Sequence, residues 1–325
     1  MPVIKANAYG HGMLQVADAL DEANGFAVAQ LGEAIALREH GINKPITVFQ
    51  GFVDSAQLKL MIQYNLRPVV SQLWQIDLLE SLSTASISPD TALQIWLKVN
   101  TGMGRLGVQP DEVTVCWQRL QQIPFIQQLG LMMHFANADQ PGKNSNQQQL
   151  NCFKQLSDEM LTQTSVSNSA AIVSRLCEQQ DWLRPGIMLY GSSPVLNVTA
   201  KSLGLQAVMS LHAELIAINH LPKGHHVGYG DGWACPDDMP IGIVNIGYGD
   251  GYPRLAPGGT PVMVNNQLTQ LVGRVSMDSI AVDLRGINAR CGDEVELWGS
   301  HVSVDEVALK AGTIAYELLC NVGQL

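Results

Sequence analysis

Cysteine, charge and long apolar runs are all scarce in this chain of 325 residues, and each shortage excludes a class of protein. The six cysteines include no C-x-x-C pair and no Cys/His spacing suited to a metal, so neither a zinc site nor a disulfide framework is indicated. The cysteine pattern fits a reducing cytoplasm. The sequence opens without the pattern of a secretory signal, and no apolar run approaches the length of a membrane span. We therefore expect a cytoplasmic protein that has no membrane partner.

Basic residues are also in deficit, with 19 lysines and arginines against 29 aspartates and glutamates. The net charge of -10 argues against a partner with a phosphate backbone, and no basic run is interleaved with aromatic residues. Nucleic acid binding is therefore not expected. Hydrophobic residues make up 46% of the chain, a normal value for a globular protein, and the length suggests about two domains.

From residue 1 to about residue 200, short β-rich runs alternate with helical patterns, which is typical of parallel strands joined by helices. The predicted strands are Pro2–Lys5, Phe26–Gln30, Pro45–Gln50, Arg67–Ser71, Gln94–Asn100, Leu129–Phe135, Asn168–Ala171 and Arg184–Tyr190. They predict an α/β fold, a (β/α)8 TIM-type barrel over residues 1–204, with its chemistry at the C-terminal strand ends. Lys5, Lys98, His134, Ser169 and Tyr190 lie at or near those ends.

Beyond about residue 205 the apolar residues change to a period of two, beginning with the run from Met209 to Ala217. This change predicts a mostly β domain over residues 205–325. Further strands are expected at Pro261–Val264, Leu271–Leu284 and Asp293–Trp298, and one helix from about Val304 to Ala311. Two loops, Gly228–Trp233 and Gly247–Tyr252, each present a tyrosine but lack the strand-to-helix context of a dinucleotide site.

Lys5 is the first candidate for chemistry, because it ends a short apolar strand just before a glycine-flanked turn. A lysine held among apolar residues is often used for its nitrogen, most commonly to form a Schiff base. Taken alone, the pattern fits a surface lysine on an edge strand better than a reactive amine. The segments that follow along the chain favour the chemical interpretation.

Five motifs in order resemble the alanine racemase family of pyridoxal-phosphate enzymes. They are Val3–Gly12, Lys98–Gly107, Arg184–Gly191, Ile246–Tyr252 and Gly273–Asp278. The resemblance extends over nearly the whole chain and implies a barrel followed by a β domain. It also implies a homodimer with shared sites that interconverts L-alanine and D-alanine and supplies D-alanine for peptidoglycan.

The resemblance implies a catalytic role for four residues. Lys5 matches the Schiff-base lysine, which would serve the α-proton of the D-enantiomer, and Tyr229 matches the base for the L-enantiomer, supplied by the other subunit. His134 matches the histidine that hydrogen-bonds this tyrosine, although by itself it reads as a core histidine. Arg184 matches the arginine that faces the pyridine nitrogen; because a guanidinium cannot accept a proton, that nitrogen would stay unprotonated. Without the resemblance, Arg184 is equally a salt-bridged rim arginine.

Further residues match positions that hold the cofactor and the substrate. The cofactor phosphate contacts would be Tyr9, Ser169, Tyr316 and the backbone amides of Gly186 and Ile187. Without the resemblance, Ser169 and Tyr316 read as ordinary structural residues.

The substrate carboxylate would be bound by Arg105 and by the Met277 amide, with Asp278 and Tyr248 at the entrance. These last two could instead be a turn carboxylate and an interface aromatic. Lys98 matches a lysine that many members carbamylate, and an anionic carbamate would hold Arg105 where an unmodified amine would repel it.

The sequence departs from the family pattern in two ways. The strand and helix that normally precede the lysine strand are absent, and the end at Gly323–Leu325 stops before the usual closing strand. Asn100 stands where the family commonly has aspartate. Three alternatives therefore remain open, namely a racemase of broader specificity, a non-catalytic pyridoxal-phosphate-binding protein and an inactive truncated form.

Overall fold

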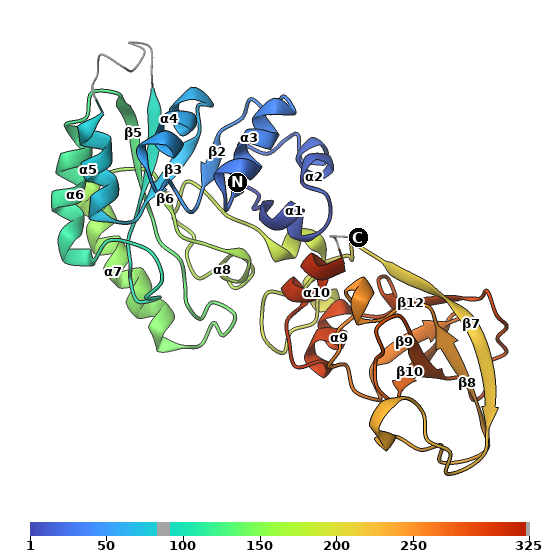
Figure 1. Cartoon of the computed structure of the whole chain (residues 1–325). Helices are drawn as coiled ribbons and strands as arrows, with labels where there is room; N and C mark the ends of the chain where they lie inside the picture. Colours follow the sequence, from blue (N-terminus) through green and yellow to red (C-terminus); the bar gives the residue numbers. More distant parts are fainter. Residues whose placement is uncertain (83–91, 323–325) are drawn as a thin grey trace. The chain divides into compact units, whose positions relative to one another are not determined.

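The computed structural model describes residues 1–82 and 92–322, and the chain divides into two compact units (Figure 1). The barrel unit comprises Met1–Ala8, Gly12–Leu189 and Pro194–Val198. The C-terminal unit comprises Tyr9–His11, Tyr190–Ser193 and Thr199–Leu325. Both units are thus assembled from segments that are distant in sequence. The boundary expected between residues 204 and 205 stays a prediction.

The barrel unit is built on a parallel sheet whose strands follow the order of the chain. These strands are β1 (Phe26–Val28), β2 (Ile46–Val48), β3 (Arg67–Val70), β4 (Leu93–Lys98), β5 (Ile126–Met132) and β6 (Thr164–Ser165). Backbone pairing closes the sheet into a ring, because Val3 bridges Ala27 and its N–H donates to the carbonyl of Pro185 at 2.8 Å. Asn168 bridges Arg184 on the remaining side. The predicted (β/α)8 barrel is therefore confirmed.

Helices flank this sheet, as Figure 1 shows. They are α2 (Met13–Ala19), α3 (Leu31–Glu39), α4 (Ser55–Gln63), α5 (Leu73–Ser81), α6 (Val113–Gln121), α7 (Asn144–Met160) and α8 (Ser169–Val173), with a 3-10 turn η2 (Pro110–Glu112) before α6. All residues of β1, β2 and β3 are buried. Strands covered on both faces read as continuous apolar runs, which is why these segments were recognisable from sequence.

Three predicted strands of the barrel are mostly replaced by turns or helix. Of Pro2–Lys5, only Val3 pairs as a bridge, and Lys5–Tyr9 forms the turn α1. The predicted strand Asn168–Ala171 is wrong, because Asn168 Oδ1 accepts the N–H of Ala171 at 3.0 Å and caps α8. After Arg184, the segment Ile187–Tyr190 is the 3-10 helix η3. At Asn168, a local capping bond thus replaced the expected extended structure.

A polar cluster lies at the start of the central strands, at the end of the barrel opposite to the catalytic candidates. Arg67 is 93% buried, donates from Nε to Gln94 and from Nη2 to Gln128 Oε1 at 2.9 Å, and lies over the Trp182 ring at 5.1 Å. Gln128 in turn donates to Gln163 at 2.7 Å. Burial lowers the pKa of Arg67 to about 10. The planar guanidinium thus binds two partly buried amide oxygens at once.

Replacing Arg67 by lysine should lower the free energy of unfolding by about 1–3 kcal/mol, because one ammonium cannot reproduce the forked geometry and leaves an amide oxygen unsatisfied. Urea denaturation measures this loss. The control is Arg290→Lys, at an arginine whose side chain is 90% exposed, which should change stability by less than about 0.5 kcal/mol. Equal stability of both variants would contradict this account of the polar cluster.

The C-terminal unit is a closed antiparallel barrel with strand order β10-β11-β8-β7-β12-β9. Its strands are β7 (Leu211–Leu221), β8 (Met239–Val244), β9 (Pro261–Val264), β10 (Gln267–Val272), β11 (Ile280–Asp283) and β12 (Glu294–Trp298). Two helices, α9 (Val304–Lys310) and α10 (Ala315–Val322), and the 3-10 turns η4 (Lys201–Leu203), η5 (Tyr229–Asp231) and η6 (Tyr248–Asp250) complete it. The core contains Trp298 stacked on Tyr252, with ring centroids 6.0 Å apart.

Most predictions for this unit are confirmed, including the β9 strand, the β12 strand and the helix from Val304. The single strand expected over Leu271–Leu284 is wrong, because β10 and β11 are separated by a turn that begins at Gly273. Gly273 has φ +68°, and a Cβ there would lie 2.6 Å from the carbonyl oxygen of Val227. The close approach of a second loop therefore requires glycine and ends the strand.

Candidate functional site

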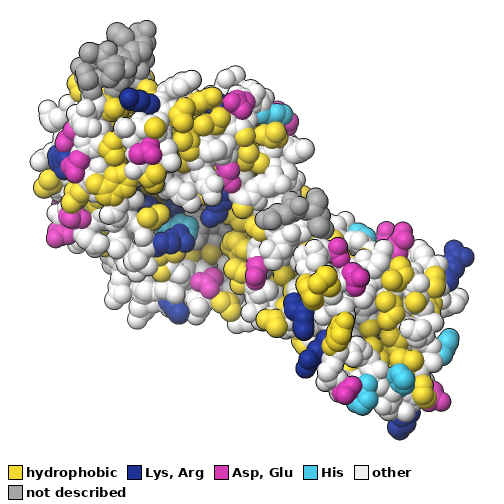
Figure 2. Space-filling view, in the orientation of Figure 1, with side chains coloured by type: hydrophobic (Ala, Val, Ile, Leu, Met, Phe, Trp, Pro, Cys, Tyr) yellow, Lys and Arg dark blue, Asp and Glu magenta, His cyan; other side chains and the backbone are white. Residues whose placement is uncertain are grey.

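Positive charge gathers at the C-terminal strand ends of the barrel unit. Lys98 is the last residue of β4 and His134 follows β5, while Arg184 pairs with the segment after β6. Lys5 and Arg105 lie close enough that their charges act on both Lys98 and His134. We call Lys5, Lys98, Arg105 and Arg184 the cationic cluster. Figure 2 shows blue cationic side chains beside a cyan histidine on the surface of the barrel unit.

Arg184 is the buried centre of this cluster, with 3% of its surface exposed. Its Nη1 donates to Ser165 Oγ at 2.5 Å, and its Nη2 donates to the carbonyls of Met133 at 2.6 Å and Val166 at 3.1 Å. Burial lowers the pKa of Arg184 to about 9, so the guanidinium is still protonated at neutral pH. It therefore joins the ends of two strands as a pure hydrogen-bond donor.

Two donors face the ring of His134. Arg184 Nη2 lies 3.4 Å from Nδ1, and the amide nitrogen of Asn168 lies 3.5 Å from Nε2. Burial, together with the charges of Arg184, Lys98, Arg105 and Lys5, holds the pKa of His134 well below its ordinary value, so the ring is neutral.

Because arginine cannot accept a hydrogen bond, we assign the ring proton of His134 to Nε2. The amide oxygen of Asn168 is occupied by the Ala171 N–H, so Asn168 presents a donor to Nε2 and cannot accept from it. With the proton on Nε2, the contact at 3.5 Å to the Asn168 amide nitrogen brings two donors together.

Lys98 is a strongly perturbed lysine of the cluster. It is 7% exposed, and burial followed by the charges of Arg184, Arg105 and Lys5 lowers its pKa from 10.5 to about 8. At this pKa a sizeable fraction of the amine is neutral, and hence nucleophilic, under mildly alkaline conditions.

The loop that carries Arg105 is organised by Asn100. Its Oδ1 accepts the backbone N–H of Gly104 at 2.9 Å and of Gly102 at 3.3 Å. Backbone bonds between Asn100 and Val108, and between Val108 and Lys98, close the loop at 2.9 Å each. The neutral amide at position 100 is therefore used to fold the loop, which leaves Arg105 exposed beside Lys98.

Ser169 offers the clearest anion-binding group of the barrel unit. Its buried hydroxyl oxygen accepts the N–H of Gly186 at 2.7 Å and that of Met188 at 3.4 Å. The hydroxyl proton is therefore directed away from these amides and suits an anionic oxygen. Ser169, Gly186 and Ile187 are neighbours in the structure, as the sequence motif implies.

Aromatic residues form a second group, which belongs to the C-terminal unit. Tyr9 lies between Tyr190 and Tyr316, with ring centroids 4.9 Å and 5.9 Å away. His11 stacks on Tyr190 at 4.5 Å, and its Nδ1 lies 3.0 Å from the carbonyl oxygen of Tyr9. Burial raises the pKa of Tyr9 above its ordinary value, so the phenol is a neutral hydrogen-bond donor. The structure thus brings together the two tyrosines assigned to the phosphate.

The remaining candidates lie on exposed loops of the C-terminal unit. Tyr229 is 70%, Met277 62% and Tyr248 40% exposed, and Asp278 is also exposed. Two of these loops are joined, because Gly249 donates its N–H to the carbonyl of Met277 at 2.7 Å.

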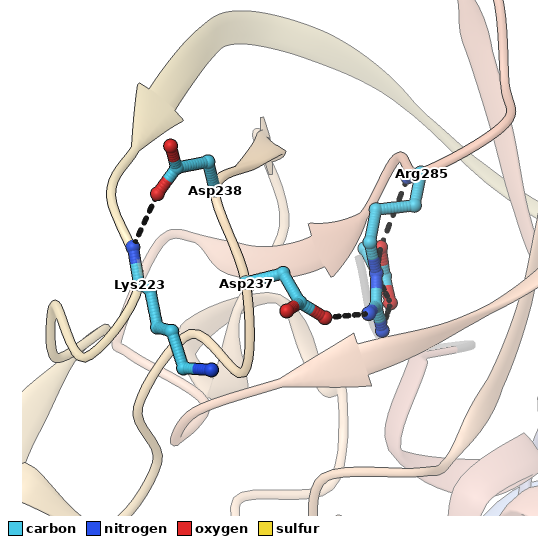
Figure 3. Close-up of polar contacts among 5 residues, drawn as sticks. Lys223, Asp237, Asp238 and Arg285 are labelled. Carbon is cyan, nitrogen blue, oxygen red and sulfur yellow. Dashed lines mark hydrogen bonds and ion pairs between the residues drawn. The ribbon is translucent and has the colours of Figure 1, made fainter.

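The segment from β7 to β8, which carries Tyr229, is fixed near its ends by charged residues (Figure 3). The Lys223 backbone N–H donates to Asp238 at 2.8 Å, and Arg285 pairs with Asp283 at 2.6 Å and with Asp237 at 3.8 Å. The tyrosine is therefore displayed on an anchored loop.

The turn after Lys5 has an unusual backbone conformation. Ala6, Asn7, Ala8 and Tyr9 all have φ of 52° or 53°, in the left-handed region that L-residues avoid at a cost of roughly 1–2 kcal/mol each. The turn is held by Asn7, whose Oδ1 accepts the Met13 N–H at 2.8 Å and whose carbonyl accepts the Gly12 N–H at 3.0 Å. Such strain persists where the surroundings over-determine it, often at functional sites.

Sequence reasoning missed several residues that organise this region. Asn168 caps α8 and faces His134, and Gln149 of α7 donates both to Thr101 Oγ1 and to the His134 carbonyl at 3.1 Å. Glu33 of α3 bonds the backbone directly after Lys5. The available signals were an Asn just before a small-residue helix and a Glu three residues into a helix, both patterns of helix capping.

A closed (β/α)8 barrel with cationic and titratable groups at its C-terminal strand ends, accompanied by a β-barrel unit, defines the protein as a barrel enzyme. Within the described ranges 1–82 and 92–322, no helix has both the length and the apolarity to cross a membrane.

Comparison with known proteins narrows this class. The family described as "Alanine racemase, N-terminal domain" matches residues 1–194, and "Alanine racemase, C-terminal domain" matches residues 208–325. The alanine racemase of Alcanivorax borkumensis is 47% identical over 323 residues, which are 99% of this chain and 89% of that protein. That of Coxiella burnetii strain Dugway is 45% identical over 329 residues, with the same coverage.

The crystal structure of biosynthetic alanine racemase from Pseudomonas aeruginosa matches with a TM-score of 0.94 at 44% identity, covering 99% of this chain and 89% of that one. The chain belongs to the alanine racemase family.

The lowered pKa of Lys98 predicts a pH-dependent stability of the cofactor-free protein in buffer depleted of CO2. Between pH 8 and pH 10.5 the folded state has lost the Lys98 proton that the unfolded state still binds, so stability rises with pH. The gain attributable to Lys98 should be on the order of 3 kcal/mol. Urea denaturation of the wild type and of Lys98→Met across this range isolates it, and parallel curves for the two proteins would contradict the assignment.

Proposed function

We propose that this protein interconverts L-alanine and D-alanine with pyridoxal phosphate, using Lys5 of one subunit and Tyr229 of the partner subunit as its two bases. The observation that carries the proposal is the contact between buried Arg184 and a neutral His134 inside the cationic cluster, in a chain of the alanine racemase family. Substrate and cofactor both carry anionic oxygens, which suit such a cluster.

The donors in each unit are chemically suited to the cofactor. Ser169, with two amides already on its oxygen, has its proton left for a phosphate oxygen, and Tyr9 and Tyr316 add phenol groups. Gly186 and Ile187 contribute backbone amides in the same role. Pyridoxal phosphate, when bound, supplies an aldehyde that links to an amine and a ring that withdraws electrons from the substrate Cα.

Arg184 would face the pyridine nitrogen. All N–H groups of its guanidinium are donors, so Arg184 can hydrogen-bond that nitrogen without transferring a proton to it at neutral pH. Keeping the nitrogen unprotonated moderates electron withdrawal, which disfavours side reactions such as transamination. The buried contacts to Ser165 and Met133 fix the plane of the guanidinium for this purpose.

The two bases act on opposite faces of the substrate. Lys5 Nζ removes or returns the α-proton on the face of the D-enantiomer, and the phenolate oxygen of Tyr229 of the partner subunit does so on the L face. His134 supports the tyrosine, because its neutral ring, with Nδ1 facing the Arg184 donor and the proton on Nε2, can donate to the phenol oxygen. Arg105 and the Met277 amide bind the carboxylate, with Asp278 and Tyr248 at the entrance.

Lys98 is proposed to carry a carbamate. The ammonium first loses a proton, and the neutral amine then attacks CO2, forms an N–C bond as one C–O π bond opens, and releases a second proton, so that a cation becomes an anion beside Arg105. The product attracts Arg105 where the free ammonium repels it, so modification relieves the charge crowding of the cluster.

A homodimer is proposed because the site needs a second subunit. Tyr229, Tyr248 and Met277 expose large apolar surfaces on loops of the C-terminal unit, as is typical of interaction surfaces. We place the enzyme in the cytoplasm, where its six free cysteines stay reduced. There its D-alanine would serve peptidoglycan synthesis.

Subunit mixing tests the shared site. Lys5→Ala and Tyr229→Phe should each be inactive alone, and Lys5→Ala should also lose the visible absorbance of the lysine-linked cofactor. After unfolding and refolding together, half of the dimers formed at random would be mixed, each with one intact site, so about a quarter of the wild-type activity should return. No recovery, despite mixed dimers seen by native mass spectrometry, would place both bases in one subunit.

Hydrogen exchange at Cα tests the roles of the two bases. In D2O, Tyr229→Phe should exchange the α-proton of D-alanine at a measurable rate while exchange from L-alanine falls by about 100-fold or more, because only the Lys5 base remains. Nuclear magnetic resonance of each enantiomer follows the exchange. Equal loss for both enantiomers with cofactor bound would refute the two-base assignment.

Exchange assays also separate the alternatives. If the wild-type protein binds the cofactor but exchanges the α-proton of neither enantiomer, it is a carrier or an inactive form. Comparable turnover of serine or lysine would establish a racemase of broader specificity.

A further inference from the structure

Glu33, the third residue of α3, links the first turn of this helix to the left-handed turn after Lys5. Its Oε1 accepts the N–H of Ala6 at 2.7 Å, and its Oε2 accepts the N–H groups of Ala29 and Gln30 at 2.9 Å each. One carboxylate therefore receives three backbone donors from two segments. Ala6 is the residue that immediately follows Lys5 and the first of the four left-handed residues.

The same arrangement recurs two strands further along the sheet, with one chemical difference. Gln75, the third residue of α5, accepts the N–H groups of Ser71 at 2.7 Å and Gln72 at 3.2 Å with its oxygen. Its amide nitrogen donates to the carbonyl of Phe52 at 2.9 Å, on the loop after β2. In both cases the helix after one strand holds the loop after the preceding strand.

The partner of each side chain explains the residue type. At Phe52 the loop presents a carbonyl, so the helix needs a donor and uses glutamine. At Ala6 the loop presents an N–H, so the helix needs a second acceptor and uses glutamate. Gln75 also demonstrates that glutamine at this helix position keeps both capping bonds. Glutamine at position 33 would therefore preserve the cap and turn an N–H donor toward the donor of Ala6.

We propose that Glu33 is a positioning residue for Lys5, holding the Ala6 amide so that the strained turn, and with it the lysine and Tyr9, keeps the conformation that the reaction uses. The inference rests on the proposed function for the role of Lys5. Glu33 does not touch the reacting atoms in this account. It acts through the backbone, by over-determining a turn that would otherwise relax to right-handed or extended conformations.

The test compares Glu33→Gln with Glu112→Gln. Glu112 has the same third position in a capping pattern, where its Oε2 accepts the Gln109 N–H at 2.8 Å, and it lies outside the Lys5 turn. The two substitutions make the same chemical change. Both variants should keep the circular dichroism and, within a few degrees, the melting temperature of the wild type, because glutamine supports the cap.

Amide hydrogen exchange reports directly on the hydrogen bond between Ala6 and Glu33. The Ala6 amide should be protected in the wild type and in Glu112→Gln, and should exchange about 100-fold faster in Glu33→Gln, because the hydrogen bond that holds this amide is lost. This measurement involves neither cofactor nor turnover. Equal protection of Ala6 in all three proteins would overturn the proposal.

Catalytic measurements then report positioning. With saturating pyridoxal phosphate, Glu33→Gln should lower kcat by about 10- to 100-fold with little change in KM for alanine, and should bind the cofactor about 10-fold more weakly in a titration of its visible absorbance. Glu112→Gln should match the wild type in kcat, in KM and in cofactor affinity. Wild-type kcat and cofactor affinity in Glu33→Gln would overturn the proposal. A wild-type protein that neither binds pyridoxal phosphate nor racemises alanine would overturn the proposed function, and the inference with it.

Discussion

The guanidinium of Arg184 must be satisfied inside a barrel, and the strand ends around it are arranged to do so. Its two terminal nitrogens bond a serine hydroxyl, two backbone carbonyls and the ring of His134. A buried charge without such partners would cost several kcal/mol. The geometry of β5, β6 and the segment from residue 184 onward is thus tied to one side chain. Ser169 and Gly186 are held within the same frame.

The strand ends that bond Arg184 also bring the positive charges of the cationic cluster close together. Burial lowers the proton affinity of Lys98 and His134, and because Arg184 remains protonated, it and the other cations lower this affinity further. Repulsion among the cations of the cluster is unfavourable, and each anionic oxygen that binds there reduces it. A phosphate, a carboxylate and a carbamate are three such groups. Relief of this repulsion therefore favours both the binding of anionic groups and catalysis. This explains why lysines and arginines occupy positions where a core would otherwise be apolar.

The sequence was most informative where one physical rule acted alone. Strands buried on both faces, such as those at Phe26 and Ile46, were found because short β-rich runs alternate there with helical patterns. The β9 strand and the helix from Val304 were found because turn residues separate the segments. Errors occurred at Asn168 and Gly273, where a side-chain cap and the approach of a distant loop decided the backbone. Both depend on contacts that a local pattern does not contain.

The candidate residues were recognised through ordered motifs, because no single one is specific. Pattern reasoning named the groups that carry charge or protons and missed those that hold them, such as Gln149 and Glu33. Their side chains bond backbone atoms of other segments, and polar residues in a helix give no sign of that partner. The assignment of Tyr229 and Met277 to a second subunit remains a prediction, although their exposure suits it.

The division of the chain into units has a consequence for how such a protein can be rebuilt or recombined. Tyr9–His11 and Tyr190–Ser193 belong to the C-terminal unit although the barrel sequence surrounds them. A gene fragment starting at residue 205 would lack Tyr9, His11 and Tyr190, and with them most of the aromatic group around Tyr316. The C-terminal unit is therefore not a transferable module, and exchange between relatives has to carry these two short segments along with it.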